Sequence, residues 1–207
     1  MKFMPDNIYH IYNQGNNQQD IFNSEEEYII ILWMIRKHVQ THAEIIAWCL
    51  MPNHFHILIS ANETGCQMVK QGGLPIEKIT NGIRKLLSGY ARIFNKKYNR
   101  SGSLFRQKTN AKNVAESVWV IKNNYILQDY CSGCFNYIHQ NPVEAALVKL
   151  PSEWKFSSYQ DFAGLRKGTL CNKELASKYC GYNEKDFAVE ANKKFGTDFL
   201  DSFLTES

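Results

Sequence analysis

The chain has 207 residues, a length that suits one domain with an appendage or at most two small domains. Its apolar fraction of 44% supports a hydrophobic core and excludes a chain that is disordered throughout, and its net charge is +4. The first residues lack the apolar segment of a signal peptide. The longest apolar run, residues 28–35, is shorter than the roughly 20 residues that cross a bilayer. We therefore expect a soluble, cytoplasmic protein.

Positive charge is concentrated in one part of the chain. No acidic residue lies between Glu77 and Glu116. That window holds ten cations, Lys78, Arg84, Lys85, Arg92, Lys96, Lys97, Arg100, Arg106, Lys108 and Lys112. The rest of the chain has 14 cations against 20 acidic residues. This segregation favours a nucleic acid bound on one surface, although a helix face exposed to water gives the same pattern.

Six cysteines stand at positions 49, 66, 131, 134, 171 and 180, and we expect them to be reduced thiols. Cys131 and Cys134 form a C-x-x-C pair. A zinc site needs two more ligands, and the spacing of Cys171 and Cys180 is poor for that purpose. Two small core residues on a helix are therefore favoured over a structural zinc or a redox pair.

The first half of the chain is predicted to form a strand, a helix and two further strands. Residues 8–14 are rich in β-forming side chains. Ser24, with Glu27 three positions later, is a capping box that predicts a helix. Strands are predicted next at 43–51 and 54–60, on either side of a proline-containing turn.

A cationic amphipathic helix is predicted to begin at Pro75, a residue that favours the first helical turn. Its apolar residues recur every three or four positions, at Ile76, Ile79, Ile83, Leu86, Tyr90 and Phe94. We expect this stripe to pack inward while the opposite face offers cations. Core packing is favoured over base stacking for Tyr90, Phe94 and Tyr98.

After this helix, residues 104–113 are predicted to be extended, and residues 118–121 and 125–127 fit a short hairpin. A last helix is predicted from about residue 129 until Pro142 ends it. In this order the elements indicate an α+β fold, a ferredoxin-like antiparallel sheet with helices packed on one face.

His54 and His56 alternate on the third strand, so both imidazoles point to one face while Phe55 points to the other. Two imidazoles on one face are able to hold a divalent ion, with a further ligand from another element. A satisfied surface pair is the alternative.

Tyr137 and Asn141 are four residues apart on the last helix and share a face. A tyrosine at such a position is ordinarily part of the core. It becomes a nucleophile for phosphoryl transfer only if its proton is removed and a nearby cation polarises the phosphate, because a phenol has a pKa near 10.

Two segments resemble motifs of one enzyme family. Residues 48–59 (WCLMPNHFHILI) resemble the HUH motif of single-tyrosine transposases, and residues 136–148 (NYIHQNPVEAALV) resemble their tyrosine helix. Residues 9–11 (YHI), 102–105 (GSLF) and 154–159 (WKFSSY) also fit. Together they resemble the REP-associated tyrosine transposases over about residues 8–164.

The resemblance implies a ferredoxin-like enzyme that binds hairpin DNA and cuts single-stranded DNA beside it. His54, His56 and, as third ligand, Asn141 would then hold Mg²⁺ or Mn²⁺. Tyr137 would attack the scissile phosphate, leaving a 5′-phosphotyrosine link and a free 3′-OH, and another 3′-OH would complete strand transfer. On this basis residues 1–164 form an HUH single-tyrosine transposase-like catalytic domain and 165–207 a C-terminal helical extension.

The expected partner is single-stranded or hairpin DNA, and a homodimer is possible because related transposases share tyrosine helices between subunits. The residues expected to contact DNA are cationic: Lys78, Arg84, Lys85, Arg92, Lys96, Arg100, Arg106 and Lys108. Two alternatives remain open. One is a hairpin-DNA-binding protein without catalytic activity, and the other is a phosphoesterase that uses water in place of the tyrosine.

The sequence departs from the family pattern in two places. Gln14-Gly15 stands where many relatives have Arg-Gly, which removes a possible phosphate contact. The stretch 114–128 is longer than usual. His10 is predicted either to contact DNA or to have a structural role, and His139 is given no role because it faces away from Tyr137 on the helix.

Overall fold

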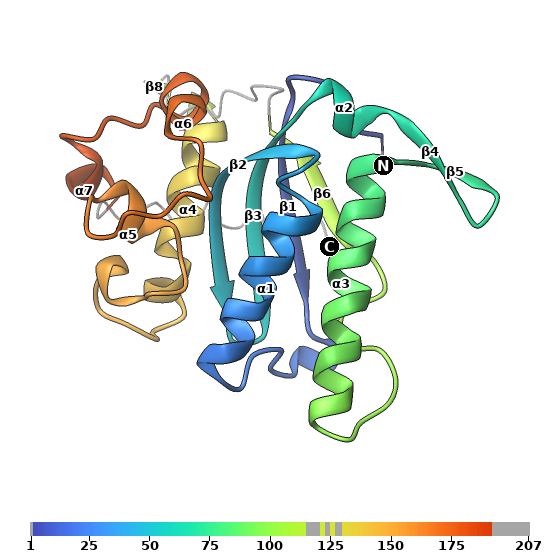
Figure 1. Ribbon diagram of the computed structural model, residues 1–207. Helices are drawn as coiled ribbons and strands as arrows, with labels where there is room; N and C mark the ends of the chain where they lie inside the picture. Colours follow the sequence, from blue (N-terminus) through green and yellow to red (C-terminus); the bar gives the residue numbers. More distant parts are fainter. Residues whose placement is uncertain (1, 115–120, 123–124, 127–129, 192–207) are drawn as a thin grey trace.

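The computed structural model describes residues 2–114, 121–122, 125–126 and 130–191. Its centre is a four-stranded antiparallel sheet (Figure 1). The strand order is β2 (Ala43–Met51), β3 (His54–Ala61), β1 (Ile8–Gln14) and β6 (Asn110–Asn113). This order, with a helix after β1 and another before β6, is the ferredoxin-like arrangement, so the predicted fold class is confirmed.

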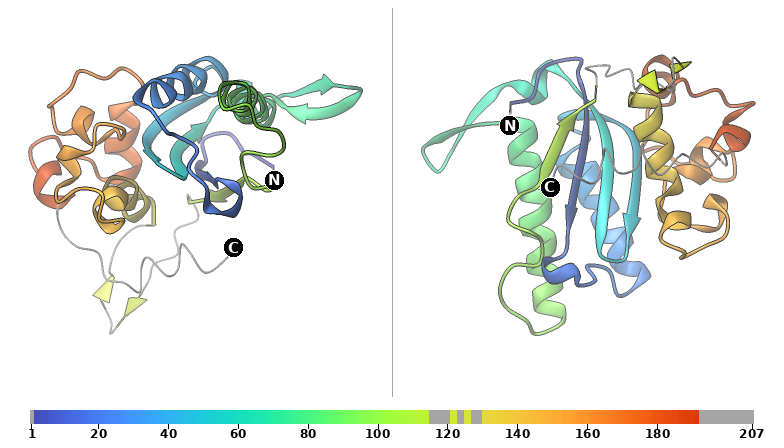
Figure 2. Two further views of the ribbon diagram at one scale, coloured as in Figure 1. Left: turned by 90° about the horizontal axis from the view of Figure 1, so that it is seen from below. Right: turned by 180° about the vertical axis from the view of Figure 1, so that it is seen from behind.

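Helices α1 (Glu25–His38) and α3 (Lys78–Lys97) cover one face of the sheet (Figure 2). The predicted apolar stripe of α3 is buried there from Ile79 to Phe94. It packs on the side chains that β3 sends to this face, among them Phe55 and Ile57. Because side chains alternate along a strand, His54 and His56 point to the opposite face.

The opposite face carries α4 (Tyr130–Glu144), mainly along β2. The buried His139 fixes α4 to β2 through a serine: its Nε2 lies 2.8 Å from Ser158 Oγ, which donates to the Trp48 carbonyl at 3.1 Å. The sheet therefore has a helical layer on each face, and the histidine pair lies between β3 and α4.

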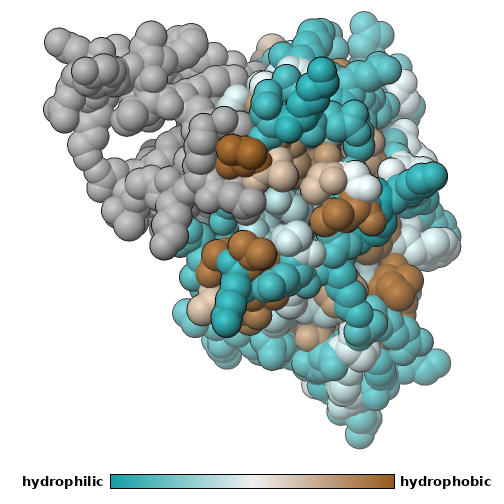
Figure 3. Space-filling model, turned by 90° about the vertical axis from the view of Figure 1, so that its left-hand side faces the viewer, coloured by the Kyte–Doolittle hydropathy of each residue, from teal (hydrophilic) through white to brown (hydrophobic). Residues whose placement is uncertain are grey.

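The shorter helices are η1 (Asn16–Gln18), α2 (Glu63–Cys66), η2 (Pro151–Glu153), α5 (Tyr159–Phe162), α6 (Lys173–Cys180) and α7 (Phe187–Glu190). The side of the molecule that carries α4 to α7 is mostly hydrophilic, with separate hydrophobic patches (Figure 3). No described helix is both long enough and apolar enough to span a membrane.

Pro75 does not begin a helix. It lies in β5 (Leu74–Glu77), which pairs with β4 (Met68–Gln71) in a ribbon that projects from the body, and α3 begins after it (Figure 1). The two residues between the strands, Gly72 and Gly73, have φ of 58° and 83°, which is typical of a tight hairpin turn. A strand proline is tolerated there because the ribbon has only edge strands.

Two other predicted boundaries lie in the second half of the chain. The predicted last helix continues through Pro142 to Glu144. Of the predicted hairpin near residue 120, β7 (Ile121–Lys122) and β8 (Tyr125–Ile126) do pair. Residues 118–120 and 127 lie outside the described residues. The division of the chain at residue 164 remains a prediction.

Candidate active site

The two histidines of β3 lie side by side on the face that α4 covers. Their ring centroids are 5.0 Å apart and the rings are nearly perpendicular. His56 is buried and His54 half-buried. Each ring has a hydrogen-bond partner at Nδ1. For His54 the partner is Asn53 Oδ1, at 2.6 Å. For His56 it is His10 Nε2, at 2.9 Å. The Nε2 atoms are therefore the ones left to face α4.

The Asn141 side chain meets both imidazoles. Its Oδ1 is 3.1 Å from His54 Nε2 and its Nδ2 is 3.3 Å from His56 Nε2. The two residues predicted on the strand and the asparagine predicted on the helix thus come together at one point, although 85 positions separate His56 from Asn141. No group of three His, Cys, Asp or Glu side chains among the described residues is placed to hold a metal ion. The Asn141 amide is the group that lies at both Nε2 atoms.

Tyr137 lies one helical turn before Asn141 and packs against His56. Its ring centroid is 5.3 Å from that of His56, edge to face, and 6.3 Å from that of His10. The side chain is only 6% exposed. Burial raises the pKa of Tyr137 to about 12, and a hydrogen bond with Asn141 opposes that rise. The phenol is therefore neutral at physiological pH in the absence of a nearby cation.

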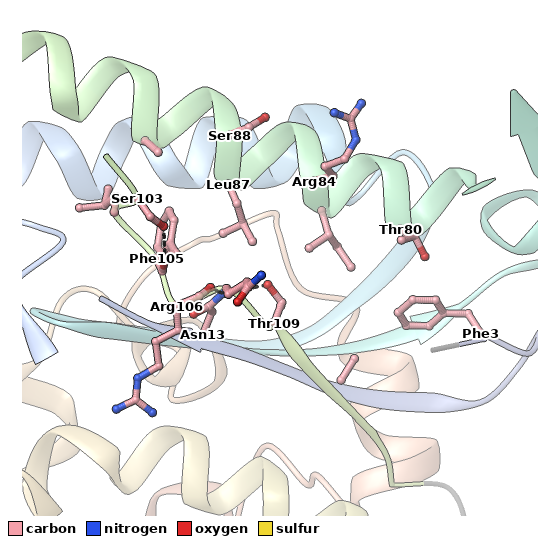
Figure 4. Close-up of a pocket in the computed structure, with 15 residues that line it drawn as sticks. Phe3, Asn13, Thr80, Arg84, Leu87, Ser88, Ser103, Phe105, Arg106 and Thr109 are labelled. Atoms are coloured by element: carbon pink, nitrogen blue, oxygen red, sulfur yellow. Dashed lines mark hydrogen bonds between the residues drawn. The ribbon is translucent and has the colours of Figure 1, made fainter. Parts of the chain in front are cut away.

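A cavity of about 200 Å³ opens beside these side chains. His54, His56 and Tyr137 line it together with two cations, Arg106 and Lys108. Both cations are exposed. Figure 4 shows the Arg106 guanidinium extending away from α3, on the other side of the sheet. The cavity thus combines candidate metal ligands, a phenol and positive charge.

A larger cavity of about 590 Å³ lies on the α3 side of the sheet (Figure 4). It lies between α3 and the segment 103–111, and its lining is mostly apolar. Arg84 is among its lining residues, but its guanidinium points away from the sheet. The candidate ligands and Tyr137 do not line this cavity.

The sheet divides the predicted DNA-contacting residues into two groups. Arg106 and Lys108 line the cavity at Tyr137, whereas α3 and the turn that follows it carry the others, Lys78, Arg84, Lys85, Arg92, Lys96 and Arg100. Tyr90 and Phe94 are buried in the core as predicted. Tyr98 is not, because it is 39% exposed and donates a hydrogen bond to Glu27.

Sequence reasoning missed one side chain at the site, Asn53, and left His10 open between contact with DNA and a structural role; the structure places His10 against His56. His10 is 2% exposed, and burial, with a further contribution from Lys112, lowers its pKa to about 3, so the ring is neutral. The pairing of β1 with β3 sets Tyr12 opposite His56 and turns His10 to the same face, a register that the sequence alone does not give. For Asn53 the signal was its place next to His54 in the turn.

Cys131 and Cys134 are both buried in α4, in the hydrophobic cluster that α4 forms with β2 and the C-terminal helices. The Cys131 sulfur lies 3.0 Å from that of Cys180 at the end of α6. These thiols therefore occupy the core position that the sequence favoured.

No protein-family model matches the sequence, and no curated protein matches it. The fold does match solved structures. One of them is the REP-associated tyrosine transposase bound to a REP hairpin, with a TM-score of 0.52 over 83% of this chain and 92% of that chain. The chain has the fold of a REP-associated tyrosine transposase. Sequence identity to that transposase is 16%, so the likeness concerns architecture, and the resemblance predicted from the motifs is confirmed at that level.

Proposed function

We propose that the protein is a metal-dependent endonuclease and strand transferase that acts on single-stranded DNA near hairpins. The observation that carries the proposal is the convergence of the Asn141 amide, both β3 imidazoles and the Tyr137 ring beside one cavity. The likeness to a transposase bound to a REP hairpin supports hairpin DNA as the substrate.

The side chains present fit a divalent cation. The His54 and His56 Nε2 atoms both approach one amide group, so two nitrogens and one oxygen are available around a single point. Imidazole nitrogens suit transition-metal ions, and the amide oxygen suits Mn²⁺ or Mg²⁺, whose remaining positions water would complete. A bound cation would supply polarisation of the scissile phosphate.

In the proposed reaction the Tyr137 oxygen attacks phosphorus and loses its proton. The bond between phosphorus and the 3′ oxygen breaks, and that oxygen leaves with a proton as a free 3′-OH. The product is a 5′-phosphotyrosine. Attack by another 3′-OH on that link releases the tyrosine and joins two strands. Arg106 and Lys108 line the same cavity and are suited to hold the phosphate there.

One chain supplies every member of this site, since the four residues meet within a single protomer. We therefore propose an active site that does not need a tyrosine from a second copy. A dimer is compatible with this arrangement but is not required by it.

The test is covalent capture. A pool of hairpin oligonucleotides with randomised single-stranded flanks, labelled at the 3′ end, is incubated with the protein and Mn²⁺ and separated on a denaturing gel. We expect a labelled protein–DNA adduct from the wild type and none from Tyr137→Phe. The matched control is Tyr130→Phe, which removes a hydroxyl from the same helix and should leave the adduct.

Each other outcome excludes the proposal in a different way. Cleaved DNA without an adduct indicates a phosphoesterase that uses water. Hairpin binding without cleavage indicates a binding protein. An adduct that survives Tyr137→Phe means that another residue is the nucleophile.

A further inference from the structure

His56 has a partner that the transposase proposal does not use. The His10 ring, from the neighbouring strand β1, lies in the same buried layer, and its Nε2 is 2.9 Å from His56 Nδ1. The two rings are stacked with centroids 5.0 Å apart, and the Tyr12 ring also stacks on His10, with centroids 4.9 Å apart. His10 is thus fixed by packing on β1.

A histidine that ligates a metal through Nε2 must carry its proton on Nδ1. In a buried site that N–H needs an acceptor, because water is not available to receive it. His54 has the Asn53 oxygen at 2.6 Å for this purpose. For His56 the atom in that place is His10 Nε2, a ring nitrogen that accepts when the proton of His10 is on Nδ1.

We propose that His10 is a positioning residue for the metal site: its Nε2 accepts the Nδ1 proton of His56 and holds the His56 ring with Nε2 toward Asn141. This inference rests on the proposed function, since it concerns the same ion. It assigns to His10 neither contact with DNA nor contact with the ion.

The test compares two substitutions that differ in the acceptor. His10→Leu removes it, whereas the Oε1 atom of His10→Gln is able to take its place. Binding of Mn²⁺ is followed by the electron paramagnetic resonance signal of the free ion. We expect His10→Leu to weaken Mn²⁺ binding by about 10- to 100-fold, as loss of an outer partner of a ligating histidine does, and His10→Gln to recover most of that loss.

His56→Ala serves as the reference for loss of a ligand. If it leaves Mn²⁺ binding unchanged, the proposed metal site itself is wrong. If it abolishes binding while His10→Leu binds as the wild type does, only the role of His10 is wrong. Equal weakening in His10→Leu and His10→Gln also overturns that role, because it points to packing and not to the acceptor.

A measurement on the unaltered protein covers the case in which a His10 variant does not fold. With ¹⁵N-labelled histidine and bound Mg²⁺, nuclear magnetic resonance reports which ring nitrogen carries each proton. The proposal requires the proton on Nδ1 of His56 and a ¹⁵N–¹⁵N coupling across the hydrogen bond to His10 Nε2. A proton on His10 Nε2 in the metal-loaded protein contradicts it.

Discussion

Asn141 faces both candidate ligands, with its oxygen toward His54 and its nitrogen toward His56. Two roles fit that position, a metal ligand through oxygen or a bridge that donates to His56. Asn141→Asp separates them, because a carboxylate ligates Mn²⁺ well but has no proton to donate. If the residue is a ligand, we expect the aspartate variant to bind Mn²⁺ at least as tightly as the wild type.

Asn141→Ala should instead weaken Mn²⁺ binding by more than about 100-fold, since the loss of a ligand exceeds the roughly 10- to 100-fold loss for an outer partner. Calorimetric titration with Mn²⁺ measures both variants, and hairpin binding in the presence of a chelator is the control that should not change. Tight Mn²⁺ binding by the alanine variant would remove Asn141 from the ligand set.

At this scale the sequence predicted which side chains share a face of β3 or of α4, but not which neighbours hold them in place. The positions of His54, His56, Tyr137 and Asn141 follow from spacing on a strand and a helix, which local periodicity reveals. His10 could not be placed in the same way. Its contact depends on the register between β1 and β3, a pairing of residues about 46 positions apart that no local pattern records.

Helices α1 and α3 are joined by a buried carboxylate, that of Glu27. One of its oxygens accepts from the Tyr98 hydroxyl at 2.6 Å and lies 2.8 Å from Lys97 Nζ, and the other accepts from the Asn23 N–H at 2.6 Å. Burial alone would raise the pKa of Glu27, but the hydrogen bonds from Lys97 and Tyr98 outweigh it and leave the pKa below the ordinary 4.5.

We expect Glu27→Gln to lower the free energy of unfolding at pH 7 by about 1–3 kcal/mol, the usual cost of breaking buried charge-assisted hydrogen bonds. Because the folded-state pKa is the lower one, this stabilisation is present above pH 4.5 and is lost as the pH falls through the folded value. The difference in the free energy of unfolding between Glu27→Gln and the wild type should therefore become smaller towards pH 3.

Urea unfolding at pH 7 and pH 3 measures this difference. The matched control is Glu26→Gln, one residue earlier, whose side chain is 74% exposed although it lies 3.4 Å from Lys97. It should change stability by less than about 0.5 kcal/mol. If Glu27→Gln lowers the free energy of unfolding equally at both pH values, the lowered pKa of Glu27 in the folded protein is contradicted.

Among the elements, the strands and the long helices were predictable because their periodic patterns are local. The β4–β5 ribbon was not predicted, because its residues are polar or exposed and a loop has the same composition. Gly72-Gly73 was a usable hairpin signal, and Pro75 was misleading, since proline suits both the first turn of a helix and an edge strand.

Across the whole molecule, positive charge runs from α3, on one face of the sheet, to Arg106 and Lys108, beside the cavity on the other. If DNA follows this charge, it passes the edge of the sheet formed by β6, since β6 is the outermost strand on that side. The two groups of cations would then contact different phosphates, the α3 group contributing to binding and the cavity group to cutting as well.

We expect the double variant Arg92→Gln/Lys96→Gln to bind hairpin DNA more weakly and to show a salt dependence reduced by about 0.7–0.9 per cation in log–log slope. Once saturated with protein, its bound DNA should still be cut at the wild-type rate. Arg106→Gln/Lys108→Gln should weaken binding and also slow cutting at saturation, because these side chains line the cavity of Tyr137.

Filter binding over a range of salt concentrations and single-turnover cleavage measure the two effects separately. Equal cleavage rates in the two double variants at saturation would show that the cavity cations serve affinity alone. A salt slope unchanged by Arg92→Gln/Lys96→Gln would remove that part of α3 from the DNA surface.

The arrangement of layers was the least predictable feature of the whole. The strand order follows from the sequence of elements, but the side on which α4 lies does not. It depends on contacts such as that between His139 and Ser158, which join α4 to β2 over long stretches of chain. A polar histidine at that position carries no local sign of which surface it will meet.

One consequence follows from the single turn of α4 that holds both Tyr137 and Asn141. Because one turn of a helix moves as a unit, the two side chains change position together. Any event that slides or rotates α4 would displace the proposed nucleophile and the proposed metal ligand in the same movement, so the proposed site would not lose one of these groups while it keeps the other.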